Sequence, residues 1–266
     1  MIRQASVAGS FYPGNQSALE EKLKEYISVS SQPQKVIGLI SPHAGYVFSG
    51  RCAGKAFGMI KIPDTVIIIG VNHRGVGYSF TIDDNEYWRT PLGDIEVDKH
   101  LQVKLVTRSK IFKADHNIGL REHSLEVQVP FIQYLNSKAK ILPIVISSSD
   151  VTKLIEAGKE IAEAIKNNPE VLLVASTDMS HFIDAEQAKY RDYMAIKEIN
   201  QLNPNGLFEV VQSKRISMCG VAPTTMMLTA ANQLGATTAE EVEYTNSGVV
   251  SGDLNEVVAY LSMLIY

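Results

Sequence analysis

Four short runs of β-branched and other apolar residues are the most regular feature of the sequence. The runs are continuous rather than interrupted by polar residues, which is typical of strands buried on both faces of a sheet. Two further segments near the end of the chain also have the composition of strands. We therefore expect strands at 36–40, 65–70, 141–146, 171–175, 241–245 and 256–265.

Between these runs, apolar residues recur at the three- and four-residue spacing of amphipathic helices. In the first such segment, Ser17 is followed three positions later by Glu20, which is the spacing of a capping box at a helix start. Pro130 lies within another segment and predicts a bend there. The expected helices span 17–28, a segment after Ser49, 98–109, 122–136, 151–167, 185–202 and 219–234.

Strands that alternate with helices along the chain indicate the α/β class, and the buried character of the strands favours parallel pairing. The 266 residues, of which 45% are apolar and 20% charged, are enough to bury a substantial core. No internal repeat and no linker rich in Pro, Gly and Ser divides the chain. We expect one domain over residues 1–266, a layered α/β/α sandwich with a largely parallel central sheet.

The composition argues against several classes of protein. No apolar run approaches the roughly 18 residues that a membrane span needs, and the first residues lack the zones of a signal peptide, so we expect a cytoplasmic protein that does not bind membranes. The formal charge of -4 and the absence of a basic block argue against a nucleic-acid-binding surface. Small molecules, peptides or other proteins are the expected partners.

The two cysteines, Cys52 and Cys219, form neither a CxxC pair nor a disulfide framework. The simplest interpretation is two buried thiols that behave as small apolar residues. Cys219 is expected near the start of a helix, however, where the positive end of the helix dipole would lower the pKa of the thiol and raise its reactivity. A functional thiol at this position is the alternative.

Histidines follow two of the expected strands at the same distance. His43 lies three residues after Ile40, and His73 lies three residues after Gly70. Ligand sites in open parallel sheets lie outside the carboxyl ends of the strands, so we expect the two imidazoles to meet at the ends of neighbouring strands. Imidazole is a common ligand of divalent first-row metals, and two histidines leave coordination positions open, as in a catalytic site.

Three further polar residues are expected at the same edge. Asp178 and His181 follow the strand at 171–175, and His123 begins the helix at 122–136. Imidazole and carboxylate groups accept and donate protons, so these residues are candidates for acid–base catalysis.

Two residues adjoin the histidine pair and are candidates for substrate binding. Tyr46 and Arg74 either contact an anionic or phenolic ligand or serve packing and ion pairing. Other chemistries lack their motifs in this sequence, which has no HExxH, GxxxxGK[ST] or GxSxG and no GxGxxG after a strand.

Six segments carry a resemblance that covers nearly the whole chain. They are RQASVAGSFYP at 3–13, SPHAGY at 41–46, GVNHRG at 70–75, REHSLEVQVPF at 121–131, STDMSHF at 176–182 and SMCG at 217–220. In this order they resemble the Memo family (mediator of cell motility). The resemblance implies a fold similar to that of class III extradiol dioxygenases, the non-haem iron enzymes that cleave catechol rings beside the diol.

In those dioxygenases, two histidines and a glutamate hold the iron, and another histidine is the acid–base catalyst. The resemblance places His43 and His73 at the two histidine ligands and His181 at the acid–base position. It places His123 in the matching segment of the pocket. Microbial members of the family often occur beside radical-SAM proteins, which implies a partner from a radical-SAM pathway.

The third metal ligand departs from the family pattern. Some Memo proteins have a cysteine near the carboxyl end, but the matching stretch 244–253 contains neither Cys nor Glu and has Val250 opposite that cysteine. Asp253, Asp178 and His181 are the candidates for this position.

Three functions are consistent with these features. The first is a metal-dependent, dioxygenase-like oxidoreductase, with iron as the first candidate and copper or zinc as alternatives. The second is a non-enzymatic module that binds a peptide or a phosphate-bearing ligand in the same cleft, as the resemblance to Memo proteins in motility signalling allows. The third is a zinc-type hydrolase that uses a metal-bound water.

Overall fold

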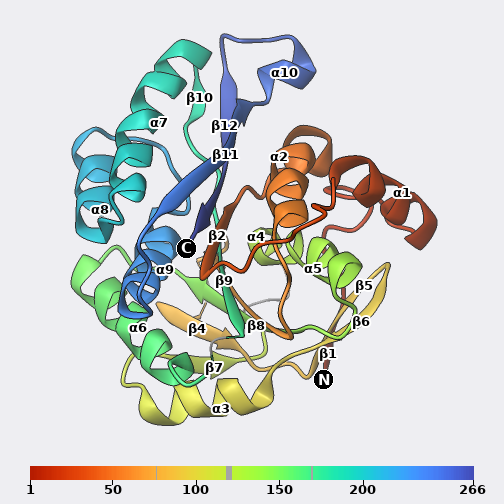
Figure 1. Ribbon diagram of the computed structural model, residues 1–266, viewed down its shortest axis with the longest axis vertical. Helices are drawn as coiled ribbons and strands as arrows, with labels where there is room; N and C mark the ends of the chain where they lie inside the picture. The colour runs from red at the N-terminus through yellow and green to blue at the C-terminus, as the bar shows by residue number, and fades with distance from the viewer. Residues whose placement is uncertain (76, 118–121, 169) are drawn as a thin grey trace.

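A mixed sheet of nine strands forms the centre of the computed structural model, which describes residues 1–75, 77–117, 122–168 and 170–266 (Figure 1). A small second sheet joins the start of the chain to a hairpin. The large sheet has the order β10 (His181–Ile183), β12 (Val257–Ile265), β2 (Gly38–Ser41), β9 (Val171–Ser176), β3 (Thr65–Val71), β8 (Lys140–Ile146), β4 (Phe80–Asp83) and β7 (Lys113–Asp115), with β11 (Ala239–Asn246) paired to β12. The small sheet has the order β1 (Ile2–Arg3), β5 (Tyr87–Thr90) and β6 (Gly93–Glu96).

The four central strands, β2, β9, β3 and β8, are parallel to one another. Their apolar residues are buried on both faces of the sheet, which explains why the sequence runs are continuous. Antiparallel strands flank this centre, because β12 pairs with β2 and β4 pairs with β8 in the opposite direction. The fold is therefore α/β with a mixed, largely parallel central sheet, as expected.

Two groups of helices pack on the sheet (Figure 1). The first group is α1 (Gln16–Tyr26), α2 (Tyr46–Met59), α4 (His123–Glu126) and α5 (Val129–Leu135). The second is α3 (Lys99–Arg108), α6 (Val151–Ile165), α8 (Pro204–Ser213) and α9 (Val221–Gln233), while α7 (Ala185–Asn200) packs on α8 and β12, and α10 (Gly248–Ser251) precedes β12. Within the described residues, no helix combines the length and the apolar character needed to cross a membrane.

Several helix boundaries differ from those expected. The first helix is capped by Asn15, whose side chain accepts a hydrogen bond from the backbone of Ala18, and not by Ser17. The second begins at Tyr46, before Ser49. The segment 122–136 is divided into α4 and α5, because Pro130 occupies the first turn of α5.

The expectation that His43 and His73 follow neighbouring strands is wrong. Strand β9 lies between β2 and β3 and pairs in parallel with both. The offset of each histidine from its strand does not reveal the order of the strands, because β9 is distant in sequence and is inserted between them. The residues after β9 therefore lie between the two histidine loops.

A buried ion pair ties the start of the chain to α4. A guanidinium nitrogen of Arg3 lies 2.7 Å from a carboxylate oxygen of Glu126, and both side chains are fully buried. The guanidinium also lies over the ring of Trp88, 3.9 Å from its centroid. The same carboxylate accepts hydrogen bonds from the backbone of Ser6 and from the hydroxyl of Tyr12, so the amino-terminal segment is held against the helix that carries His123.

We expect Arg3→Met to lower the free energy of unfolding by about 3–5 kcal/mol, because it leaves the buried carboxylate of Glu126 without its cation. Urea unfolding monitored by circular dichroism measures the loss. Lys35→Met is the matched control, since Lys35 pairs with Glu170 on the surface and its removal should change stability little. Equal losses in the two variants would contradict a dominant role for the buried pair.

Candidate metal centre

Three histidines meet at the carboxyl edge of the central strands. His43 follows β2, His73 follows β3, and His123 begins α4. The ring centroids of His43 and His73 are 5.3 Å apart, and those of His73 and His123 are 4.6 Å apart. One ligand atom from each of the three rings lies within 4.8 Å of the others, which is a group that could hold a metal ion.

The rings of His43 and His73 approach each other although β9 separates the strands that precede them. Adjacent strands are about 4.8 Å apart, so two strands separated by a third are roughly 10 Å apart at their backbones. The imidazole side chains span this gap. The equal offsets in the sequence therefore predicted the convergence of the two rings, although the strands are not neighbours.

Glu122 orients the ring of His73. Its carboxylate accepts one hydrogen bond from Nδ1 of His73, at 2.8 Å, and another from the backbone nitrogen of the same residue, also at 2.8 Å. Burial alone would raise the pKa of Glu122, but the hydrogen bonds that it accepts from the ring and backbone of His73 and from the backbone of Ser124 lower it to about 2. Because an ionised carboxylate only accepts hydrogen bonds, Nδ1 of His73 carries a proton, and in the neutral ring the lone pair is therefore on Nε2.

His43 is almost fully buried, with 2% of its surface exposed. Its backbone nitrogen donates to Oδ1 of Asp178 at 2.7 Å, and its Nδ1 lies 3.1 Å from the hydroxyl oxygen of Ser176. Burial, together with the nearby histidines, lowers the pKa of His43 well below its usual value. The ring is therefore neutral at physiological pH, which is the form that binds metals.

Cys219 lies beside one member of this group, His43, although the sequence analysis offered a functional thiol here only as an alternative. Its Sγ lies 3.2 Å from Nε2 of His43 and accepts a hydrogen bond from the backbone nitrogen of Asp178 at 3.3 Å. The expectation that the helix dipole would lower the pKa of the thiol is not met, because burial and the charge of Asp178 raise it to about 12. The segment SMCG was the signal for this position.

The carboxyl-terminal stretch provides no comparable donor among the described residues. Val250 is in α10 and 49% exposed, and the side chain of Asp253 accepts hydrogen bonds from Asn255 in an exposed turn. Neither belongs to the group of three histidines. The sulfur that lies 3.2 Å from His43 instead belongs to Cys219, which precedes α9.

The two remaining acid–base candidates differ in their surroundings. Asp178 is buried, and burial raises its pKa to about 6 even though the backbone of His43 donates to it. His181 is partly exposed, and its Nδ1 lies 2.9 Å from the backbone oxygen of Ser217. A carbonyl oxygen only accepts hydrogen bonds, so Nδ1 of His181 carries a proton, and in the neutral ring Nε2 can accept one.

The two candidates for substrate binding also differ. Tyr46 is buried, its hydroxyl donates to the backbone oxygen of Val127 at 2.7 Å, and its ring packs against Phe131. The structure therefore gives Tyr46 a packing role. Arg74 is exposed beside His73, and its backbone nitrogen donates to the side chain of Asn72.

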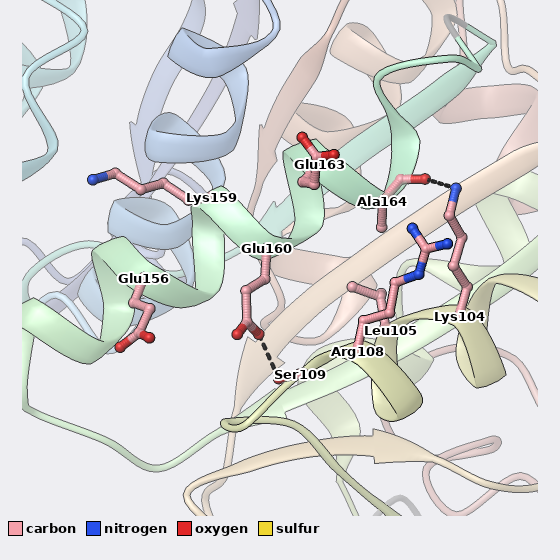
Figure 2. Close-up of a pocket in the computed structure, with 9 residues that line it drawn as sticks. All are labelled: Lys104, Leu105, Arg108, Ser109, Glu156, Lys159, Glu160, Glu163 and Ala164. Atoms are coloured by element: carbon pink, nitrogen blue, oxygen red, sulfur yellow. Dashed lines mark hydrogen bonds between the residues drawn. The ribbon is translucent and has the colours of Figure 1, made fainter.

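A hollow of about 270 Å³ lies between α3 and α6, and none of the described residues that line it is a histidine. Figure 2 shows that its charged side chains come from two helices and that two of them, Lys104 and Glu160, bond to neighbouring protein groups. Ser109 donates to Glu160, and Lys104 donates to the backbone oxygen of Ala164. We regard it as a groove between helices and place the candidate site at the histidine group.

Comparison with known proteins agrees with this architecture. The chain is 13% identical to an uncharacterized Escherichia coli K12 protein, JW3007, whose crystal structure superposes with a TM-score of 0.53 over 86% of this chain and 99% of that one. At this level of identity the likeness concerns the fold alone.

Closer relatives cover essentially the whole chain. A MEMO1 family protein of Methanosarcina barkeri is 40% identical over 99% of this chain and 100% of its own length, and one of Aquifex aeolicus is 36% identical over 99% and 98%. The family model described as "Memo-like protein" matches residues 3–264. The chain therefore belongs to the Memo-like protein family.

Proposed function

We propose that this protein is a metal-dependent enzyme in which His43 and His73 hold one divalent first-row metal ion. Iron is the first candidate, and copper and zinc are the alternatives. The observation that carries the proposal is the convergence of three imidazoles whose ligand atoms lie within 4.8 Å of one another. Two of these rings are held in place by buried acceptors, as is typical of metal-binding histidines.

The chemistry and spacing of the donors fit a metal. Two donors on one ion, a nitrogen at about 2.0–2.1 Å and a sulfur at about 2.3 Å, are separated by about 3.1–3.6 Å for octahedral to tetrahedral angles. The Sγ of Cys219 and the Nε2 of His43 are 3.2 Å apart. We therefore propose Cys219 as a further donor, in place of the carboxylates suggested by the sequence.

The carboxylates have other partners. Glu122 accepts hydrogen bonds from His73, and Asp178 accepts one from the backbone of His43. We assign both to the support of the ligands and not to direct coordination. A metal in this position would supply Lewis-acid or redox chemistry to a bound substrate.

The remaining groups would move protons and bind the substrate. His181, whose Nδ1 is held by the backbone of Ser217, is the first candidate for a general base, and His123 is the second if it does not coordinate the metal. Arg74 is exposed and directly follows His73 in the chain, so we propose that it attracts an anionic or phenolic group. We propose a small organic molecule or a peptide as substrate, with a radical-SAM protein as the pathway partner.

A zinc-type hydrolase is the second candidate, and the third histidine favours it. Three imidazoles and an open position form a common catalytic zinc site, whereas the common non-haem iron site has two histidines and a carboxylate. If His123 is a ligand, the donor set has the zinc pattern. Metal identity separates these two candidates.

We expect the protein purified without chelators to contain one equivalent of metal, and we expect His43→Ala and His73→Ala each to lose it. Elemental analysis after anaerobic reconstitution measures the stoichiometry. His100→Ala is the control, because His100 is an exposed residue outside the group. A native protein that binds no iron, copper or zinc would overturn the proposal and leave a non-enzymatic binding module as the better function.

We expect Glu122→Gln to weaken metal affinity by roughly 10- to 100-fold, because it removes the charge that makes His73 a better donor. Competition with a chromophoric chelator measures the dissociation constant for zinc. Glu25→Gln, which removes an exposed carboxylate that pairs with Lys22, is the control. An unchanged affinity in Glu122→Gln would show that the charge of Glu122 does not support metal binding through His73.

A further inference from the structure

A buried hydroxyl lies directly behind the ring of His43. Ser176 is the last residue of β9, and it is fully buried. Its hydroxyl donates to the backbone oxygen of Ser124 at 2.6 Å and accepts a hydrogen bond from Nε2 of Gln128 at 2.9 Å. The third neighbour of this oxygen is Nδ1 of His43, at 3.1 Å.

The partners of Gln128 determine which way its amide faces. Its Nε2 also lies 2.9 Å from the backbone oxygen of Pro42, and a carbonyl oxygen can only accept a hydrogen bond. The NH₂ group must therefore face both Pro42 and Ser176. The other side-chain atom, Oε1, is buried without a hydrogen-bond partner among the described residues, so the amide is held by its two donated bonds.

This arrangement leaves one choice for His43. A hydroxyl has one proton and two lone pairs. The proton of Ser176 is directed at Ser124, and one lone pair receives the hydrogen bond from Gln128. The remaining lone pair faces Nδ1 of His43, which must carry a proton to make a hydrogen bond, since two lone pairs would repel.

We propose that Ser176, held by Gln128 and the carbonyl of Ser124, is a positioning residue that fixes His43 as the Nδ1–H tautomer. The lone pair of Nε2 then always points toward Cys219, where the proposed metal would bind. The benefit of this tautomer for metal binding rests on the proposed function. The assignment of the tautomer does not rest on it, because the assignment follows from contacts within the protein.

The two proposed histidine ligands are thus supported by different chemistry. His73 is held by an ionised carboxylate, whereas His43 is held by a neutral hydroxyl that has no other free lone pair. A neutral acceptor adds no charge beside the buried ring. It selects the tautomer by geometry alone, so the choice depends on the network behind Ser176 as well as on Ser176 itself.

Ser176→Ala tests this assignment in the full-length, metal-free protein. We expect long-range ¹H–¹⁵N correlation spectra of the histidine rings to show His43 only as the Nδ1–H tautomer in the wild type. In Ser176→Ala, the Nε2–H tautomer should appear. Zinc affinity, measured by chelator competition, should fall roughly 10- to 100-fold in the same variant.

Two other variants make the test specific. Ser41→Ala is the matched control, because Ser41 is the partner of Ser176 in the β2–β9 ladder and its buried hydroxyl has no hydrogen-bond partner among the described residues. It should leave the tautomer and the zinc affinity unchanged. Gln128→Met keeps Ser176 but removes the hydrogen bond that occupies the second lone pair of its hydroxyl, so the hydroxyl can rotate. The Nε2–H tautomer of His43 should therefore also appear in this variant. Gln128→Met is the alternative test if Ser176→Ala does not fold.

The inference is overturned if the wild type shows the Nε2–H tautomer, or if Ser176→Ala and Gln128→Met both keep the wild-type ring spectrum. A wild type that binds no zinc, copper or iron would refute the proposed function. The spectra would still decide the role of Ser176, because they are recorded without metal.

Discussion

Strand β9 pairs in parallel with β2 on one side and with β3 on the other, and the site depends on this double pairing. The ladder aligns Ser41 with Ser176 and Ile69 with Ala175, so three strands end at nearly the same level. Parallel strands present their carboxyl ends to one edge, and the loops that follow must share the space above it. Donors from three parts of the chain that are far apart in sequence therefore meet at this edge.

The arrangement depends equally on α4. This short helix carries Glu122 at its cap and His123 in its first turn, and four residues could not hold a stable position alone. The buried pair of Arg3 and Glu126 fixes it to the amino-terminal segment. The amino-terminal segment, which the family match at residues 3–264 includes, therefore acts on the site through α4 and from outside the central sheet.

The sequence was informative where one residue type or one spacing had a single physical meaning. Continuous apolar runs identified the central strands, and equal offsets identified the convergence of His43 and His73. The order of strands could not be predicted, because it depends on tertiary pairing. Very short strands such as β1 were missed because two residues carry no periodicity. Helix α8 was also missed, although Asn203 and Pro204 have the residue types of a helix start and could have indicated it.

Residue roles at the site were harder to predict than its location. Tyr46 adjoins His43 in sequence, but the helix that begins there turns its ring into the core. Cys219 is 176 positions from His43, and only the fold shows that the thiol reaches Nε2. Ser176 gave no signal of its own, since a serine at a strand end is common, and its meaning comes from three partners that belong to other elements.

Charge balance explains why this set of groups suits a divalent ion at a partly buried position. Imidazole ligands donate lone pairs but no charge, so a divalent ion held by His43 and His73 alone would be costly to bury. Glu122 supplies one negative charge behind His73. Cys219 would supply the second on losing its proton to metal binding, which overcomes a pKa that burial otherwise raises to about 12. In the proposed site, the thiol is thus neutral without metal and anionic only when a cation is present to balance it.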